Sequence, residues 1–116
     1  MRNFRDLSIW LKSHLFTLKI YSTTKKYPKE EAFGLISQMR RSASSIPTNI
    51  AEGCGRSSNP DFKRFLTIAF GSSSELEYQL ILSKDLEYIS ESVFKELETD
   101  LIETRKMIHS FVKNVP

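Results

Sequence analysis

The sequence predicts an all-α protein folded as an antiparallel, up-down-up-down four-helix bundle. Four segments repeat apolar residues at spacings of three and four, which is the period of one helix face. Glycine and proline fall mostly between these segments, and no segment alternates apolar and polar residues as a half-buried strand does. Short connections between helices of about 20 residues favour the up-down arrangement.

Length and composition indicate one domain. The chain has 116 residues, of which 40% are hydrophobic, so we expect a single bundle over residues 1–116 with one packed core. No apolar run approaches the roughly 20 residues that a membrane-spanning helix needs, and the first residues lack a secretory signal pattern. The lone cysteine, Cys54, has no partner for an internal disulfide. We therefore expect a cytoplasmic protein without membrane contact.

The first helix is expected over residues 7–27. Asp6 is suited to cap its N-terminus, and Pro28 ends it because a proline ring disfavours helical geometry in the preceding residue. The stripe expected to face the core is Leu7, Leu11, His14, Leu18 and Tyr21. A second apolar row on the opposite side is interpreted as a contact surface for another copy of the chain, unless the whole helix is more buried than one stripe implies. This row is Ile9, Phe16, Ile20 and Tyr27.

The second helix is expected over residues 30–53. Pro47 removes the hydrogen bond that the Ala43 carbonyl would accept and should bend the helix, and Ser44 or Ser45 could donate to the freed carbonyl. Gly53 is interpreted as a helix-terminating residue that can take a left-handed conformation. The expected core stripe is Ile36, Met39, Ala43, Ile46 and Ile50.

The third and fourth helices are expected over residues 60–86 and 91–113. Asn59 is an expected N-cap with Pro60 at the first helical position, and Ser90 is the expected N-cap of the last helix. The core stripe of the third helix is Phe62, Phe65, Leu66, Ala69, Ser73, Leu76 and Leu80. That of the fourth is Phe94, Leu97, Leu101, Thr104, Ile108, Phe111 and Val115.

Polar residues within the second and third helices predict a network that fixes their register. In an antiparallel hairpin, residues equally far from the turn lie at the same height. This argument places Arg41 beside Glu75, and we expect the two to be in contact, with Asn49 satisfying nearby backbone. The predicted network is Arg41, Asn49, Glu52 and Glu75, with Lys63 or Arg64 as the partner of Glu52.

Charge is distributed unevenly along the chain. Residues 1–64 carry 12 Lys and Arg against 5 Asp and Glu, whereas residues 65–116 carry 5 against 9. In the bundle, six basic residues gather at the end that holds the turn near residue 57, against Asp6, Glu52 and Asp61. Such an end could bind a phosphate backbone, or it could be a solvated rim without a ligand. The six are Arg2, Arg5, Arg56, Lys63, Arg64 and Lys113.

No catalytic, metal or cofactor pattern is found. Gly53 and Gly55 give G-x-G, but position 58 is serine and no strand precedes it, so the nucleotide-loop motif is incomplete. Cys54 with His14 and His109 makes neither a set of metal ligands nor a convincing nucleophile–base dyad. We therefore expect no enzyme activity, no metal and no cofactor.

Three stretches carry a family resemblance that extends from Phe4 to Ile89. "FRDLSIW", "YPKEEAFGLISQMRRSASSIPTNIAEGCGR" and "FKRFLTIAFGSSSELEYQL" resemble the four-helix-bundle proteins encoded by intervening sequences in bacterial 23S rRNA genes. The fourth helix matches only by its heptad. The most specific positions are Gln38, Arg41, Ser45, Asn49 to Gly53, Arg56, Gly71, Ser72, Glu75 and Leu76.

The resemblance implies a homo-oligomer, a pentamer of four-helix protomers. Some similar proteins are accessory proteins of diversity-generating retroelements, which associate with a reverse transcriptase and with nucleic acid through basic surface. We therefore hypothesise a non-enzymatic, homo-oligomeric binding module for RNA or DNA, or for a nucleic-acid enzyme such as a reverse transcriptase. The alternative hypothesis is a protein-binding or self-assembling scaffold with no nucleic-acid role.

Overall fold

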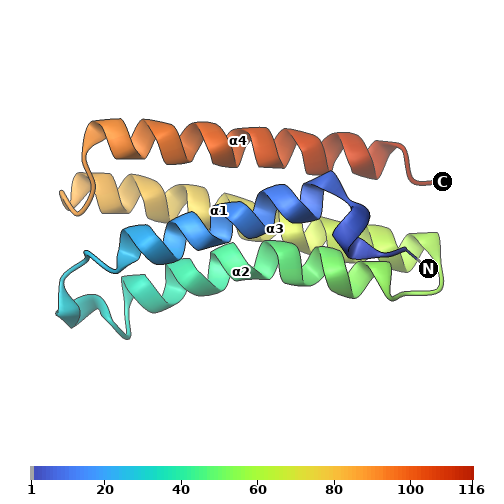
Figure 1. The fold of residues 1–116 in the computed structure, drawn as a ribbon, viewed down its shortest axis with the longest axis horizontal. Helices are drawn as coiled ribbons and strands as arrows, with labels where there is room; N and C mark the ends of the chain where they lie inside the picture. Colours follow the sequence, from blue (N-terminus) through green and yellow to red (C-terminus); the bar gives the residue numbers. More distant parts are fainter. Residues whose placement is uncertain (1) are drawn as a thin grey trace.

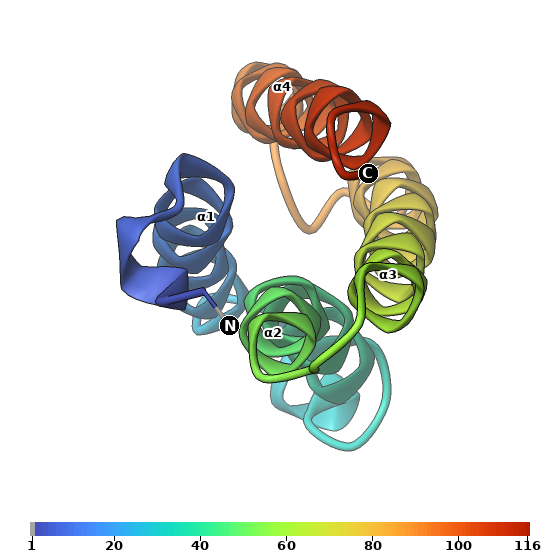
Figure 2. The ribbon, with the colours of Figure 1, turned by 90° about the vertical axis from the view of Figure 1, so that its right-hand side faces the viewer.

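A computed structural model describes residues 2–116, which form an all-helical, antiparallel up-down bundle (Figure 1), as predicted. The helices are α1 (Ser8–Thr24), α2 (Leu35–Cys54), α3 (Asn59–Asp85) and α4 (Glu91–Lys113), with short 3₁₀ turns η1 (Phe4–Asp6) and η2 (Lys29–Glu31). Consecutive helices are neighbours around the bundle, and α1 and α4 are the neighbouring pair in least contact (Figure 2). Both termini and the turn between α2 and α3 lie at one end (Figure 1).

Serine side chains cap the two C-terminal helices. The Ser90 hydroxyl accepts a hydrogen bond from the Val93 N–H (3.1 Å), so Ser90 is the N-cap of α4, as predicted. The cap of α3 is Ser58, whose hydroxyl accepts from the Asp61 N–H (3.2 Å). The predicted cap, Asn59, is therefore wrong by one position and is the first residue of the helix.

The starts of α1 and α2 also differ from the prediction. Leu7 occupies the cap position of α1 without a side-chain hydrogen bond, while the predicted cap, Asp6, belongs to η1. The helix α2 begins at Leu35 rather than at residue 30, because residues 29–31 form the separate turn η2. The Glu31 carboxylate accepts from the Leu35 N–H (3.3 Å) and so joins this turn to the helix.

The core is built from one stripe of each helix. Along α2, the predicted residues Met39, Ala43, Ile46 and Ile50 are fully buried. The predicted stripe of α3 is buried throughout, and five of the seven residues predicted for α4 are buried within that helix. These α4 residues are Phe94, Leu97, Leu101, Thr104 and Ile108.

The buried face of α1 is opposite to the predicted one. Ile9, Phe16, Ile20 and Tyr27 are at most 5% exposed, so the prediction that they form an oligomer interface is wrong: they belong to the core of the single chain. The reason is that this face also carries hydroxyl residues that can be buried. Thr17 and Thr24 donate to backbone carbonyls of their own helix (2.8 Å each), which satisfies their hydroxyls without water.

A carbonyl freed by proline links α1 to α2. Pro47 lies inside α2 and cannot donate to the Ala43 carbonyl. The Thr17 hydroxyl, from α1, donates to that oxygen at 3.1 Å, sharing its proton with the Ser13 carbonyl. The prediction that a nearby serine fills this role is wrong, because Ser44 donates to a different carbonyl and Ser45 pairs with a serine on α3.

We predict that Thr17→Val destabilises the protein by about 1–2 kcal/mol, because the buried Ala43 carbonyl loses this donor. Urea unfolding followed by circular dichroism measures the change. Pro47→Ala supplies a backbone N–H that can donate to the same carbonyl, so in this background Thr17→Val should cost clearly less. An equal loss in both backgrounds would contradict the assignment.

Gly53 does not terminate α2. The helix continues through it to Cys54, and none of the glycines in residues 2–116 has a positive φ, so the left-handed interpretation is wrong. Gly53 is instead the point at which α2 approaches α3. A Cβ placed there would lie 2.9 Å from Phe62 Cδ1, closer than real Cβ contacts come, and 3.0 Å from Phe65 Cβ, which is tighter than most of them.

Two glycine substitutions should have opposite effects. Gly53→Ala is expected to reduce stability by about 1–3 kcal/mol, because the added methyl group forces α2 and α3 apart. Gly71 lies within α3, and a Cβ there would meet no atom within 4 Å. Gly71→Ala should therefore raise stability by about 0.5–1 kcal/mol through its effect on helix propensity. Urea titration of both variants checks the pair, and equal effects would contradict the packing role of Gly53.

Candidate nucleic-acid interface

The basic end of the bundle, defined by Arg2, Arg5, Arg56, Lys63, Arg64 and Lys113, is assembled from three segments of the chain. These are the N-terminal segment, the turn after α2 with the start of α3, and the last turn of α4 (Figure 1). The Arg2 N–H donates to the Cys54 carbonyl at 3.3 Å, which holds the N-terminal segment against the end of α2. The sequence-based prediction that these segments share one end agrees with this arrangement.

Aromatic rings contact all four arginines of the basic end, three of them through Phe62 and Phe65. The Arg2 guanidinium lies 4.3 Å from the centre of the Phe62 ring. Arg56 and Arg64 both lie over Phe65, at 4.7 and 4.4 Å. A ring beneath a guanidinium restricts its position, and the N–H groups that make no other contact remain available to an anion.

Carboxylates neutralise part of this end. Asp61 accepts from Arg64 at 2.9 Å and lies 3.6 Å from Arg56. Glu52 pairs with Arg56 at 2.7 Å, one turn along from it. The predicted pairing of Glu52 with Lys63 or Arg64 is therefore wrong: the partner within i,i+4 reach is preferred over one on the other helix.

The other cations of the basic end make no ion pair within the described residues. Arg5 lies over the Phe4 ring at 4.9 Å, and Lys113 is exposed in the last turn of α4. Lys63 is partly buried near the start of α3, within the helix. Arg2 also makes no ion pair within the described residues, so four cations offer uncompensated charge to a ligand.

The predicted polar network forms differently from the prediction. Asn49 donates to the Ser45 carbonyl (2.7 Å) and hydroxyl (2.9 Å), which confirms its role in satisfying nearby backbone. Arg41 and Glu75 line one groove between α2 and α3, but no ion pair or hydrogen bond joins them. The predicted direct contact is wrong: Arg41 lines the groove from α2 and Glu75 from α3, and their charged groups do not come within ion-pair distance.

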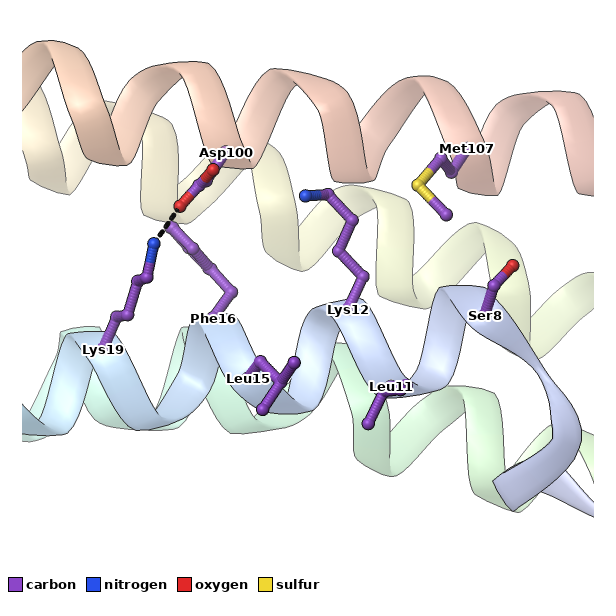
Figure 3. Close-up of a pocket in the computed structure, with 8 residues that line it drawn as sticks. All are labelled: Ser8, Leu11, Lys12, Leu15, Phe16, Lys19, Asp100 and Met107. Atoms are coloured by element: carbon purple, nitrogen blue, oxygen red, sulfur yellow. Dashed lines mark hydrogen bonds and ion pairs between the residues drawn. The ribbon is translucent and has the colours of Figure 1, made fainter.

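The residues that the sequence analysis missed lie on α1. Leu11, Leu15 and Leu18, here called the leucine stripe, are 49%, 51% and 53% exposed. Their i, i+4, i+7 spacing indicated that they share one face of the helix. The sequence analysis, however, assigned Leu11 and Leu18 on this face to the core rather than to the surface. In Figure 3, Phe16 and Lys19 point toward α4 whereas Leu11 points away from it.

A groove of about 360 Å³ runs between α1 and α4 beside the leucine stripe. Phe16 and Met107 contribute apolar lining, and the ion pair between Lys19 and Asp100 crosses the gap (Figure 3). Lys19 contacts Asp100 at 2.6 Å, and Lys12 contacts Glu103 at 3.5 Å. The hydrogen bond from Lys19 to the Asp100 carboxylate raises the pKa of Lys19 above its usual value.

The cysteine and the histidines do not form a reactive cluster. Burial raises the pKa of the Cys54 thiol, which disfavours the thiolate. His14 stacks on Trp10 (5.1 Å between ring centres), and His109 lies against Phe70 (6.2 Å). Within residues 2–116, no three His, Cys, Asp or Glu side chains gather as metal ligands would.

Comparison with known proteins identifies the family. The sequence pattern of the 23S rRNA-intervening sequence protein family matches residues 5–110. The chain belongs to this family. The match includes α4, where the sequence resemblance was limited to a heptad.

A solved structure supports the same conclusion. It is described as a protein with unknown function from the S23 ribosomal protein family of Bacteroides thetaiotaomicron. It is 32% identical to this chain, with a TM-score of 0.85, over 91% of this chain and 96% of its own. A search of curated proteins finds no match. No described helix of this family member has the length and apolar character needed to cross a membrane.

Proposed function

We propose that this protein is a non-enzymatic, homo-oligomeric binding module that holds structured nucleic acid at the basic end of the bundle. The observation that supports this proposal is the convergence of three chain segments to place six cationic residues at one end, against Asp6, Glu52 and Asp61. Guanidinium groups stacked on Phe62 and Phe65 are pre-oriented for phosphate oxygens.

Self-association would strengthen such binding. One protomer offers four uncompensated cations, whereas several basic ends in one assembly engage a single nucleic acid with a high effective concentration. The leucine stripe is the surface proposed to pack against another copy, since an aligned apolar row facing solvent is unfavourable in a monomer. A pentamer is the assembly that we propose.

A nucleic-acid enzyme, such as a reverse transcriptase, is a further proposed partner for the same assembly. The proposed location is the cytoplasm, where the unpaired Cys54 stays reduced. The leucine stripe also supports the alternative of a self-assembling or protein-binding scaffold without a nucleic-acid role.

The first experiment measures RNA binding by fluorescence anisotropy with a labelled hairpin that carries a single-stranded tail. We expect salt-dependent binding that falls at least tenfold in Arg5→Glu/Lys63→Glu/Lys113→Glu, with a salt slope smaller by about two to three. These positions lie outside the ion pairs of the basic end, so the fold should persist.

The matched control reverses three lysines at the other end of the bundle. Lys25→Glu/Lys26→Glu/Lys29→Glu changes the net charge equally, at exposed positions. It should retain binding within about threefold. Equal losses in both triple variants would mean that net charge alone governs binding, and no binding at low salt would favour the scaffold.

The second experiment tests the leucine stripe by measuring mass in solution. We expect an oligomer of the 13.4 kDa chain that dissociates in Leu11→Gln/Leu15→Gln/Leu18→Gln. The control is Tyr78→Gln/Ile81→Gln/Leu86→Gln, which removes equally exposed apolar residues elsewhere and should leave the oligomer intact. A monomeric wild-type protein, or an oligomer unaffected by the first triple variant, would contradict the assignment.

A further inference from the structure

A polar groove lies on the α2–α3 hairpin, away from the basic end. It encloses about 540 Å³, enough for one nucleotide unit, and every residue that lines it is polar. The α2–α3 groove is lined by Gln38, Arg41, Ser42, Ser45, Ser72 and Glu75. Neither the bundle core nor the basic end includes these side chains.

Arg41 in this groove lacks an intramolecular partner. Every other arginine in the described chain contacts a carboxylate, a hydroxyl or an aromatic ring. Arg41 makes no such contact, although it stands exposed beside several hydroxyl groups. A guanidinium held at the wall of a polar groove is suited to bind an anion.

The hydroxyl groups of the groove provide an independent observation. Ser42 is only 4% exposed, lines the groove, and takes part in none of the side-chain hydrogen bonds of the described residues. Its hydroxyl oxygen is not fully enclosed by the protein, so it opens onto the groove and is available to a polar ligand. Ser45 and Ser72 share a hydrogen bond of 2.8 Å, and Asn49 holds Ser45 in place.

Glu75 restricts the kind of anion. Its carboxylate is exposed, makes no ion pair, and lines the same groove as Arg41. A multiply charged phosphate would be repelled by this carboxylate. The groove therefore suits a ligand with a singly charged acceptor group for Arg41 and a hydroxyl donor for Glu75. A ribonucleotide unit of RNA has both, in its phosphodiester and its 2′-hydroxyl, and DNA lacks the second.

The position of the groove agrees with such a ligand. Ser45 and Arg56 are eleven residues apart along α2 and its C-terminal turn, or about 16 Å at the helical rise. A single strand whose phosphates contact the basic end spans this distance with a few nucleotides.

We propose that the α2–α3 groove binds one nucleotide of single-stranded RNA, with the phosphodiester on Arg41 and the groove hydroxyls and the ribose 2′-hydroxyl on Glu75. This proposal rests on the proposed nucleic-acid function and adds RNA specificity to it. Arg41 binds the backbone without regard to sugar, and Glu75 discriminates RNA from DNA.

The test compares RNA and DNA 20-mers of identical, unstructured sequence by fluorescence anisotropy at several salt concentrations. We expect the wild-type protein to prefer RNA by about tenfold, the effect of one hydrogen bond to a charged group. Glu75→Ala should reduce this preference to less than about threefold with DNA affinity retained. Arg41→Ala should weaken both ligands by about tenfold and lower the salt slope by about one.

The controls are Lys95→Ala and Glu98→Ala on α4, which change the same charges without touching the groove and should leave both affinities unchanged. If RNA and DNA bind equally and Glu75→Ala changes nothing, the groove proposal is overturned while the basic-end function stands. If Arg41→Ala also binds normally, the groove has another occupant, such as a polar segment of a protein. If the wild-type protein binds neither ligand, both proposals fail.

Discussion

The arrangement of this bundle depends on how the Ala43 carbonyl is satisfied. Pro47 leaves that oxygen without its helical donor, and Thr17 of α1 supplies one. For Thr17 to face α2, the helix α1 must turn so that Phe16 and Ile20 enter the core. The same rotation places the leucine stripe in solvent. One buried hydrogen bond is therefore consistent with both the packing of α1 and the surface that it exposes.

A second constraint is the close approach of α2 and α3 at Gly53. The absence of a side chain there lets the Phe62 and Phe65 rings pack directly against the α2 backbone. Phe65 then supports two guanidinium groups, from Arg56 and Arg64. The packing of the hairpin and the geometry of the basic end thus have the same origin. Asp61, in the first turn of α3, limits the charge gathered there by pairing with both arginines.

The α2–α3 hairpin carries both proposed nucleic-acid sites. The basic end offers several charges with little directional specificity, which suits phosphate contacts along a backbone. The α2–α3 groove offers few charges but a fixed set of donors and acceptors, since Asn49, Ser45 and Ser72 hold one another in place. Affinity and discrimination would then come from different parts of one rigid element. Of the neighbouring helix pairs, α1 and α4 are in least contact with each other. Their outer faces remain available for assembly with other copies of the chain.

The sequence by itself determined the number of helices, their direction, the core stripes of α2, α3 and α4, and the gathering of charge at one end. These features follow from local periodicity, helix caps and chain connectivity. They depend little on how one helix packs against its neighbour. It predicted Asn49 correctly because that side chain bonds within its own helix. Only the tertiary structure decided which of two apolar faces of α1 is buried, because both faces have helical spacing and the choice depends on Thr17 reaching another helix. It also decided that Arg41 and Glu75 line a groove without forming an ion pair, since the distance between their charged groups depends on how the two helices pack.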